Sequence, residues 1–317
     1  MISLKRILFG LGLFLVLVIG ACSEFMEHSL AERHMVLLSP SDRIETSVYQ
    51  QIFWWEAMDD ALFYRLQVVT PSFDSAASLV LDTLVKTDKF IFTLDPGHYQ
   101  WRVRGENGSS RTEYATHAFV VYPSSLKEQS LRLNSPATGL LTSQPDIMFS
   151  WPKLFGALNY RLQIDTNNFV DESKVLLNVL LDGQTYIFSP VTEGHYQFRI
   201  RAENATENSK WSTAGLLTFD STPPSKVNLE FPANSGTVSS PVSLKWTAER
   251  DAVAYQLFVY KSDSVSVLNN TFPLRLSANS HGFSFGNPGE KLIWRVRAMD
   301  KAGNLGPYSD YRSFFIQ

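Results

Sequence analysis

One eleven-residue stretch occurs twice in this chain. Residues 97–107 read GHYQWRVRGEN, and residues 194–204 read GHYQFRIRAEN, 97 positions later. A shorter version, LIWRVRAMD, occupies residues 292–300. A period near 95 residues is too long for a solenoid repeat and matches the length of one β-sandwich domain. The chain of 317 residues is therefore predicted to contain three copies of one such domain.

Apolar and polar side chains alternate within each copy. The first copy alternates Tyr99, Trp101 and Val103 with Gln100, Arg102 and Arg104. Successive side chains of a strand point to opposite faces, so one face is predicted to be core and the other solvated, as in antiparallel sheets. With 44% hydrophobic and 13% aromatic residues the chain can fill several cores, which argues against disorder. The fold class is predicted to be all-β.

Two further features recur before each copy. A tryptophan stands nine positions ahead of a tyrosine in the pairs Trp55 and Tyr64, Trp151 and Tyr160, and Trp246 and Tyr255. Each copy also begins with a segment ending in proline, at residues 37–40, 133–136 and 229–232. These features resemble fibronectin type III domains and related bacterial immunoglobulin-like domains. The resemblance implies three tandem antiparallel β-sandwiches. It also implies tyrosine corners, in which a strand tyrosine bonds the backbone a few residues upstream, at Tyr99 and Tyr196. The third copy has Leu292 at this position, so its corner is expected to be lost.

The N-terminus carries the pattern of an exported lipoprotein. Lys5 and Arg6 precede 15 apolar residues, Ile7–Ala21, which is short for a membrane span and typical of a signal peptide. The alternative is a short transmembrane helix. Residues 19–22, Ile-Gly-Ala-Cys, resemble the bacterial lipobox, which implies acylation of Cys22. Cys22 is the only cysteine, so no disulfide can form within the chain.

These features divide the chain into five parts. We expect a lipoprotein signal peptide at 1–21, a lipidated tether at 22–34, and β-sandwiches at 35–122, 126–220 and 225–317. Residues 23–33 of the tether could extend roughly 36–40 Å. The early acidic residues Glu24 and Glu27 resemble the surface-export signal of Bacteroidetes lipoproteins. The expected location is the bacterial cell envelope, with the lipid in the outer membrane and the periplasmic or surface face left open.

The mature sequence contains no recognised motif for catalysis or cofactor binding. We find no G-x-S-x-G elbow, no H-E-x-x-H pair and no phosphate-binding glycine loop. We therefore predict no catalytic residue, no metal ligand and no cofactor, and the protein is not expected to be an enzyme. The formal net charge of −3, without a long basic run, argues against nucleic acid as a partner.

Five residues are candidates for ligand binding. Four outward arginines of the first two copies could line a polar groove for acidic glycans or a partner protein: Arg65, Arg102, Arg161 and Arg199. We favour the interpretation that such arginines stack on neighbouring aromatic rings and form the ordinary polar face of the sheet. Trp54 must point away from the core residue Trp55, where it could stack on a sugar ring or a partner, or cover the tether or the next domain.

The predicted function is that of a non-catalytic, lipid-anchored envelope protein. Its partners would be the membrane, through the N-terminal lipid, and a cell-surface glycan or envelope protein, bound or scaffolded through the tandem domains. The alternatives are a purely structural spacer and an accessory subunit of a hydrolase or uptake system. Fold alone does not distinguish these functions.

Overall fold

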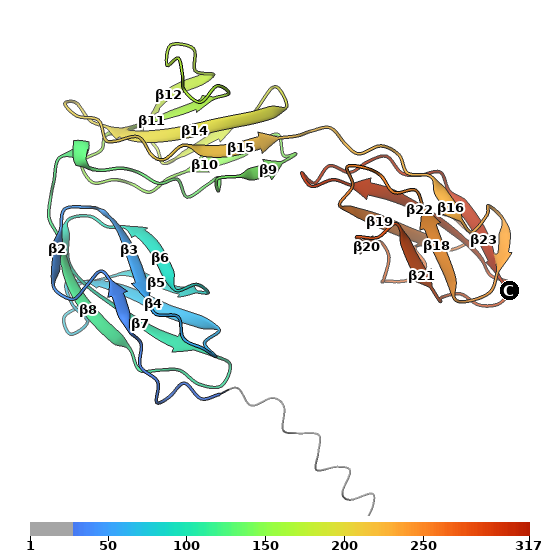
Figure 1. The fold of residues 1–317 in the computed structure, drawn as a ribbon, viewed down its shortest axis with the longest axis horizontal. Helices are drawn as coiled ribbons and strands as arrows, with labels where there is room; N and C mark the ends of the chain where they lie inside the picture. The colour runs from blue at the N-terminus through green and yellow to red at the C-terminus, as the bar shows by residue number, and fades with distance from the viewer. Residues whose placement is uncertain (1–27) are drawn as a thin grey trace, which may run out of the picture. The chain divides into compact units, whose positions relative to one another are not determined.

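The computed structural model describes residues 28–317. The predicted signal peptide, the lipid acceptor Cys22 and the first part of the predicted tether lie outside the described residues. The described chain consists of short strands with one turn of 3₁₀ helix, η1 (Leu126–Glu128). It is all-β, and its strands form three fibronectin type III-like sandwiches (Figure 1).

The first sandwich packs a three-stranded sheet against a five-stranded sheet. The small sheet has the order β1 (Leu37–Ser39), β3 (Gln50–Trp55) and β6 (Lys89–Thr93). The large sheet has the order β2 (Ile44–Thr46), β8 (Ala115–Val121), β7 (Gly97–Glu106), β4 (Phe63–Thr70) and β5 (Ser78–Val85).

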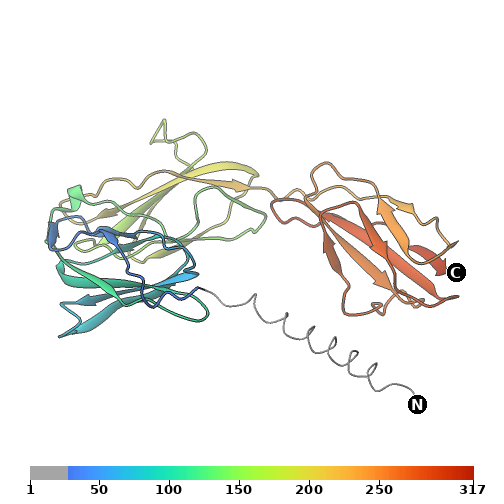
Figure 2. The same cartoon turned by 60° about the horizontal axis from the view of Figure 1, so that its bottom comes forward.

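The second and third sandwiches repeat this plan. In the second, β10 (Ile147–Ser150) pairs with β13 (Thr185–Phe188), opposite a sheet of β12 (Leu177–Leu181), β11 (Asn159–Asp165), β14 (Gly194–Glu203), β15 (Gly215–Phe219) and β9 (Leu140–Thr142). In the third, β16 (Leu229–Phe231), β18 (Val242–Trp246) and β21 (Ser280–Phe283) face a sheet of β17 (Gly236–Val238), β23 (Arg312–Ile316), β22 (Lys291–Met299), β19 (Ala254–Tyr260) and β20 (Leu274–Leu276). Figure 2 shows the same strands from a second direction.

A short parallel pair occurs in each large sheet, which the repeat did not predict. The pairs are β2 with β8, β9 with β15 and β17 with β23. Each follows a proline, at Pro40, Pro136 and Pro232. Proline has no N–H group to donate to a ladder, so it ends pairing with the small sheet, and the chain continues along the edge of the large one.

The recurring tryptophans fill the cores, as predicted. Trp55, Trp151 and Trp246 are buried, and each lies against the tyrosine of the next strand with ring centroids 5.4, 5.8 and 5.6 Å apart. The alternation is confirmed too, since Tyr99, Trp101 and Val103 are buried while Arg102 and Arg104 lie on the other face. The third sandwich has a hydrophobic cluster of its own, from Val227 to Ile316.

Both tyrosine corners are formed. The Tyr99 hydroxyl donates to the carbonyl oxygen of Asp95 at 2.8 Å, and the Tyr196 hydroxyl donates to the carbonyl oxygen of Thr192. Leu292 takes this place in the third sandwich and is fully buried. Packing therefore replaces the corner hydrogen bond there, as the resemblance implied.

By compactness the chain divides into two units, which do not coincide with the three sandwiches. One contains residues up to 131 together with 153–158 and 202–210. The other contains residues 132–152, 159–201 and 211–317. The predicted domain boundaries stay predictions.

Candidate functional site

Arg199 on β14 is enclosed by aromatic rings. Its guanidinium carbon lies 4.2 Å from the ring centroid of Phe169 and 4.3 Å from that of Trp211. Both distances lie within the range of a cation–π contact. Its Nε donates to Gln163 Oε1 at 2.9 Å, and its Nη2 pairs with Glu172 Oε1 at 2.6 Å. Only 15% of the side chain remains exposed.

The first sandwich has the same arrangement around Arg102 on β7. Its guanidinium carbon lies 4.0 Å from the ring centroid of Phe73 and 4.2 Å from that of Tyr114. Its Nε donates to Gln67 Oε1 at 2.9 Å, as Arg199 does to Gln163. The favoured interpretation of these two arginines, stacking on aromatic rings, agrees with this geometry.

The third sandwich contains a similar stack of arginine side chains on an aromatic ring, which we call an arginine ladder. The sequence did not predict it. The guanidinium carbon of Arg295 lies 3.8 Å from the ring centroid of Tyr308, and that of Arg297 lies 4.7 Å from it. A signal was present in the sequence, because Tyr114, Trp211 and Tyr308 are spaced 97 positions apart. The aromatic residue at this place in each repeat is the stacking partner of the arginines.

The other two candidate arginines make polar contacts on the same faces. Arg65 Nη1 bonds Asp82 Oδ1 at 3.0 Å, and this hydrogen bond is the main cause that raises the pKa of the guanidinium. Burial acts to raise the pKa of the Asp82 carboxyl group, but the hydrogen bonds from Gln67 and Arg65 together outweigh it, so the pKa is lowered. Arg161 Nη1 donates to Asn178 Oδ1 at 3.2 Å.

The polar face of the second sandwich is less exposed than predicted. Gln163 is 3% exposed and Gln197 is 8% exposed, although both lie on the expected outward face. The Asn168 amide, next to Phe169, donates to Gln197 Oε1 at 3.2 Å. Gln163 is in contact with the Arg199 guanidinium, which donates to its Oε1. These contacts engage Arg199 and the two glutamines within the second sandwich.

We expect Arg199→Ala to lower the free energy of unfolding by about 2–3 kcal/mol. The variant loses two cation–π contacts and leaves the buried Gln163 oxygen without its donor. Denaturant unfolding followed by tryptophan fluorescence measures the loss. The exposed pair Lys210 and Glu128 provides the control, because Lys210→Ala should cost less than about 1 kcal/mol. If Arg199→Ala and Lys210→Ala lowered the free energy of unfolding equally, the stacking of Arg199 on its aromatic rings would not be stabilising.

Trp54 points outward on β3, as predicted, with 45% of the residue exposed. Its Nε1 donates to Asp88 Oδ2 at 3.3 Å. Lys89 lies directly across on β6, and Ile52 lies across from Ile91 on the same side of the small sheet. We call these four residues, Ile52, Trp54, Lys89 and Ile91, the Trp54 face.

The Trp54 face is not repeated in full. The second sandwich keeps an exposed apolar pair, Met148 across from Ile187, but has Ser150 in place of the tryptophan. The third sandwich places Ser243 across from Gly282 and Lys245 across from Ser280. An exposed indole on this sheet therefore distinguishes the first sandwich, whereas the arginine ladders occur in all three.

Residues 28–317 show neither a metal site of clustered ligands nor a membrane-spanning helix. No group of three or more His, Cys, Asp and Glu side chains is arranged to hold a metal ion in this part of the chain. No helix within the same range is long and apolar enough to cross a membrane.

The comparisons with known proteins identify no family. No family model matches the chain, and no curated protein matches it. Among solved structures, the FN1–FN3 domains of chicken CNTN1 cover 89% of this chain and 97% of their own at 14% identity and a TM-score of 0.43. The fibronectin(III)-like modules of Clostridium thermocellum CbhA cover 59% and 94% at 12% identity and a TM-score of 0.40.

Proposed function

We propose that this chain is a non-catalytic protein of the bacterial cell envelope that binds a surface ligand through the Trp54 face. Its anchor would be lipid on Cys22, located in the outer membrane of a Bacteroidetes-type cell. The sequence before Cys22 supports the anchor, because a positive start, 15 apolar residues and Ile-Gly-Ala-Cys form the pattern of a lipoprotein signal. Several acyl chains on one cysteine would hold the protein stably, whereas a single chain gives only marginal binding.

The observation that carries the binding function is the exposed indole of Trp54. An outward tryptophan among outward isoleucines presents an apolar surface, and such surfaces on monomeric proteins mark sites of interaction. Asp88 and Lys89 add a hydrogen-bond acceptor and donor beside the ring. An indole flanked by polar groups suits a pyranose ring, whose apolar face can stack while its hydroxyls make hydrogen bonds. We therefore assign a cell-surface glycan as the ligand, with an envelope protein as the alternative.

The contacts of the candidate arginines support a non-catalytic role. Arg102 and Arg199 are enclosed by rings, and Arg65 is paired with Asp82, so these cations are engaged within their own sandwiches. A group that stabilises a developing negative charge must instead point at the place where substrate binds.

The Trp54→Ala variant tests this proposal. We expect it to weaken glycan binding about tenfold, because a central stacked aromatic contributes 1–2 kcal/mol or more to binding. Its free energy of unfolding should change by less than about 1 kcal/mol, since the ring faces water. Binding would be screened on an array of bacterial surface glycans and then measured by quenching of tryptophan fluorescence.

Ile187→Ala is the matched control for that experiment. It removes an exposed apolar side chain from the equivalent sheet of the second sandwich and should leave binding unchanged. If Trp54→Ala and Ile187→Ala bind like the unaltered protein, the Trp54 face is not the site. If the unaltered protein binds neither glycans nor envelope proteins, the proposed binding function is wrong, and the spacer and accessory-subunit alternatives stand.

A further inference from the structure

The segment in front of the first sandwich is a repeat of the segment in front of the second. Residues 29–40 read SLAERHMVLLSP and residues 125–136 read SLKEQSLRLNSP, 96 positions apart. Six of the twelve positions are identical. We call residues 28–35 the first lead segment and residues 124–131 the second lead segment. The first lies almost entirely within the part of the chain that the sequence analysis treated as a tether.

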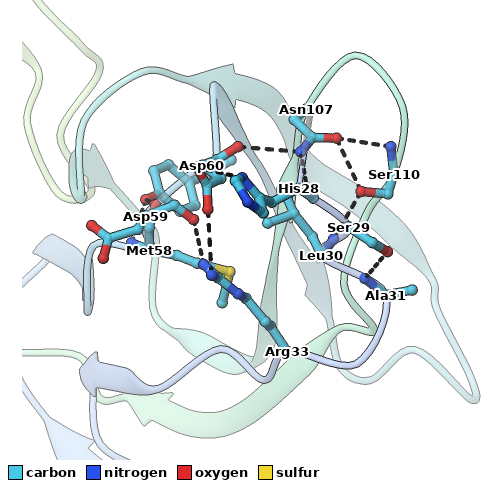
Figure 3. Close-up of polar contacts among 11 residues, drawn as sticks. His28, Ser29, Leu30, Ala31, Arg33, Met58, Asp59, Asp60, Asn107 and Ser110 are labelled. Carbon is cyan, nitrogen blue, oxygen red and sulfur yellow. Dashed lines mark hydrogen bonds and ion pairs between the residues drawn. The ribbon is translucent and has the colours of Figure 1, made fainter. Parts of the chain in front are cut away.

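The first lead segment is bonded to the first sandwich (Figure 3). The Leu30 amide donates to Ser110 Oγ at 2.8 Å, and Asn107 Nδ2 donates to the His28 carbonyl oxygen at 2.9 Å. Arg33 Nη2 pairs with Asp60 Oδ2 at 3.3 Å. Figure 3 shows these contacts converging from the 58–60 loop and from the 107–110 turn that follows β7.

The second lead segment makes the equivalent contacts with the turn that follows β14. The Leu126 amide donates to Glu207 Oε2 at 2.8 Å, and the Ser125 hydroxyl donates to Glu207 Oε1 at 2.9 Å. These two hydrogen bonds, led by that from Ser125, lower the pKa of Glu207. Ser110 and Glu207 occupy the same place, three residues after the asparagines Asn107 and Asn204.

The asparagines organise both turns in the same way. Asn107 Oδ1 accepts from the amide of Ser110 at 2.8 Å, and Asn204 Oδ1 accepts from that of Glu207 at 2.8 Å. Each Nδ2 also donates to a carbonyl oxygen of the preceding loop, at Asp60 and Gly156. Asn107 differs from Asn204 in having a further bond, to His28 of the first lead segment.

Burial shows that both lead segments are fixed by apolar contact as well. Leu30 is 0% exposed and the equivalent Leu126 is 3% exposed. Met35 and Leu131, five residues further along, are also buried. Burying two large apolar side chains stabilises a docked segment by roughly 3–6 kcal/mol before the entropy of ordering it is subtracted. Residues 28–35 are therefore held against the first sandwich by hydrogen bonds and by apolar burial.

We propose that the docked first lead segment makes the 58–60 loop and the 107–110 turn the membrane-facing surface of the first sandwich. This inference rests on the proposed lipid anchor at Cys22. Only residues 23–27 separate Cys22 from the docked His28, and whatever their conformation they span at most roughly 20–22 Å. The tether predicted from the sequence would have reached roughly 36–40 Å. A bilayer surface is thus the partner that this end of the sandwich meets.

Trypsin cleavage after Arg33 tests whether the segment is docked in the full chain purified in detergent. In the unaltered protein this bond should be protected. Asn107→Ala removes the bonds to His28 and Asp60 and should speed the appearance of a new N-terminus at His34 about tenfold, because cleavage follows the population of the undocked state. Asn204→Ala, which disturbs the equivalent turn of the second sandwich, should leave the rate unchanged. Rapid cleavage of the unaltered protein, or equal rates in all three, overturns the proposal.

A dye attached through a new cysteine tests the orientation in vesicles that carry nitroxide headgroups. Ser109→Cys places the dye in the 107–110 turn, and Asp95→Cys places it before β7, about 30 Å away along that strand. We expect quenching at 109 and none above background at 95. Equal quenching at both positions overturns the orientation.

The two proposals can fail separately. An acylated Cys22 has no thiol, so dye appearing on Cys22 itself would show that the anchor is missing. The trypsin result needs no lipid and would still decide whether the first lead segment is docked.

Discussion

Trp151→Ala is expected to lower the free energy of unfolding of the second sandwich by about 3–5 kcal/mol, the cost of removing a large aromatic side chain from a core. Trp151 is 2% exposed and packs against Tyr160. The loss is a large fraction of the roughly 5–15 kcal/mol that stabilises a typical protein, so the second sandwich should unfold at a clearly lower denaturant concentration. Denaturant unfolding and limited proteolysis would measure it.

The damage should stay within the second sandwich. The third sandwich has its own buried cluster, and the first has its own tryptophan and tyrosine pair. Proteolysis should attack residues near 130–220 and spare the regions on either side. Uniform digestion of the chain, or none, would contradict three separate cores.

Trp151→Phe is the control for lost volume, because it keeps an aromatic ring in the core. Within residues 28–317 the Trp151 Nε1 has no hydrogen-bond partner, and the same holds for Trp55 and Trp246. Replacement by phenylalanine therefore removes no hydrogen bond and leaves a smaller cavity than alanine does. We expect it to cost clearly less than Trp151→Ala. Equal costs would mean that the indole contributes more than its volume.

Cys22→Ala is expected to abolish incorporation of labelled fatty acid completely. The thioether to diacylglycerol requires a thiol, and the chain has no second cysteine to accept lipid. Growth with a labelled fatty acid followed by purification would measure the effect. Retention in the membrane fraction is the weaker measurement, because an uncleaved apolar segment could hold the variant there.

Ser23→Ala is the matched control for the anchor, since it changes the neighbouring position and leaves the thiol in place. It should incorporate label like the unaltered protein. Label that persists in Cys22→Ala would overturn the lipobox interpretation and leave the short transmembrane helix as the alternative.

The sequence alone was enough to predict the sandwiches, because their signals are local and repeated. Alternation in residues 97–107 and 194–204 defined two-faced strands, and the recurring Trp55, Trp151 and Trp246 marked buried positions in each copy. Strand side chains have a fixed period of two, so neighbours in sequence settle which of them face the core. The outward direction of Trp54 followed from the same rule.

Only the tertiary structure decided what the outward face does. Arg199 meets Phe169 and Trp211, 30 residues before it and 12 after it, and loop conformation rather than strand period brings these rings to it. Asn168 of the same loop bonds Gln197, and Gln163 and Gln197 are both buried although alternation had placed them in solvent. The first lead segment is a second feature that the sequence could not decide. Its polar composition is typical of a tether, but it is bonded to Asn107 and Ser110, about 80 residues away in the sequence.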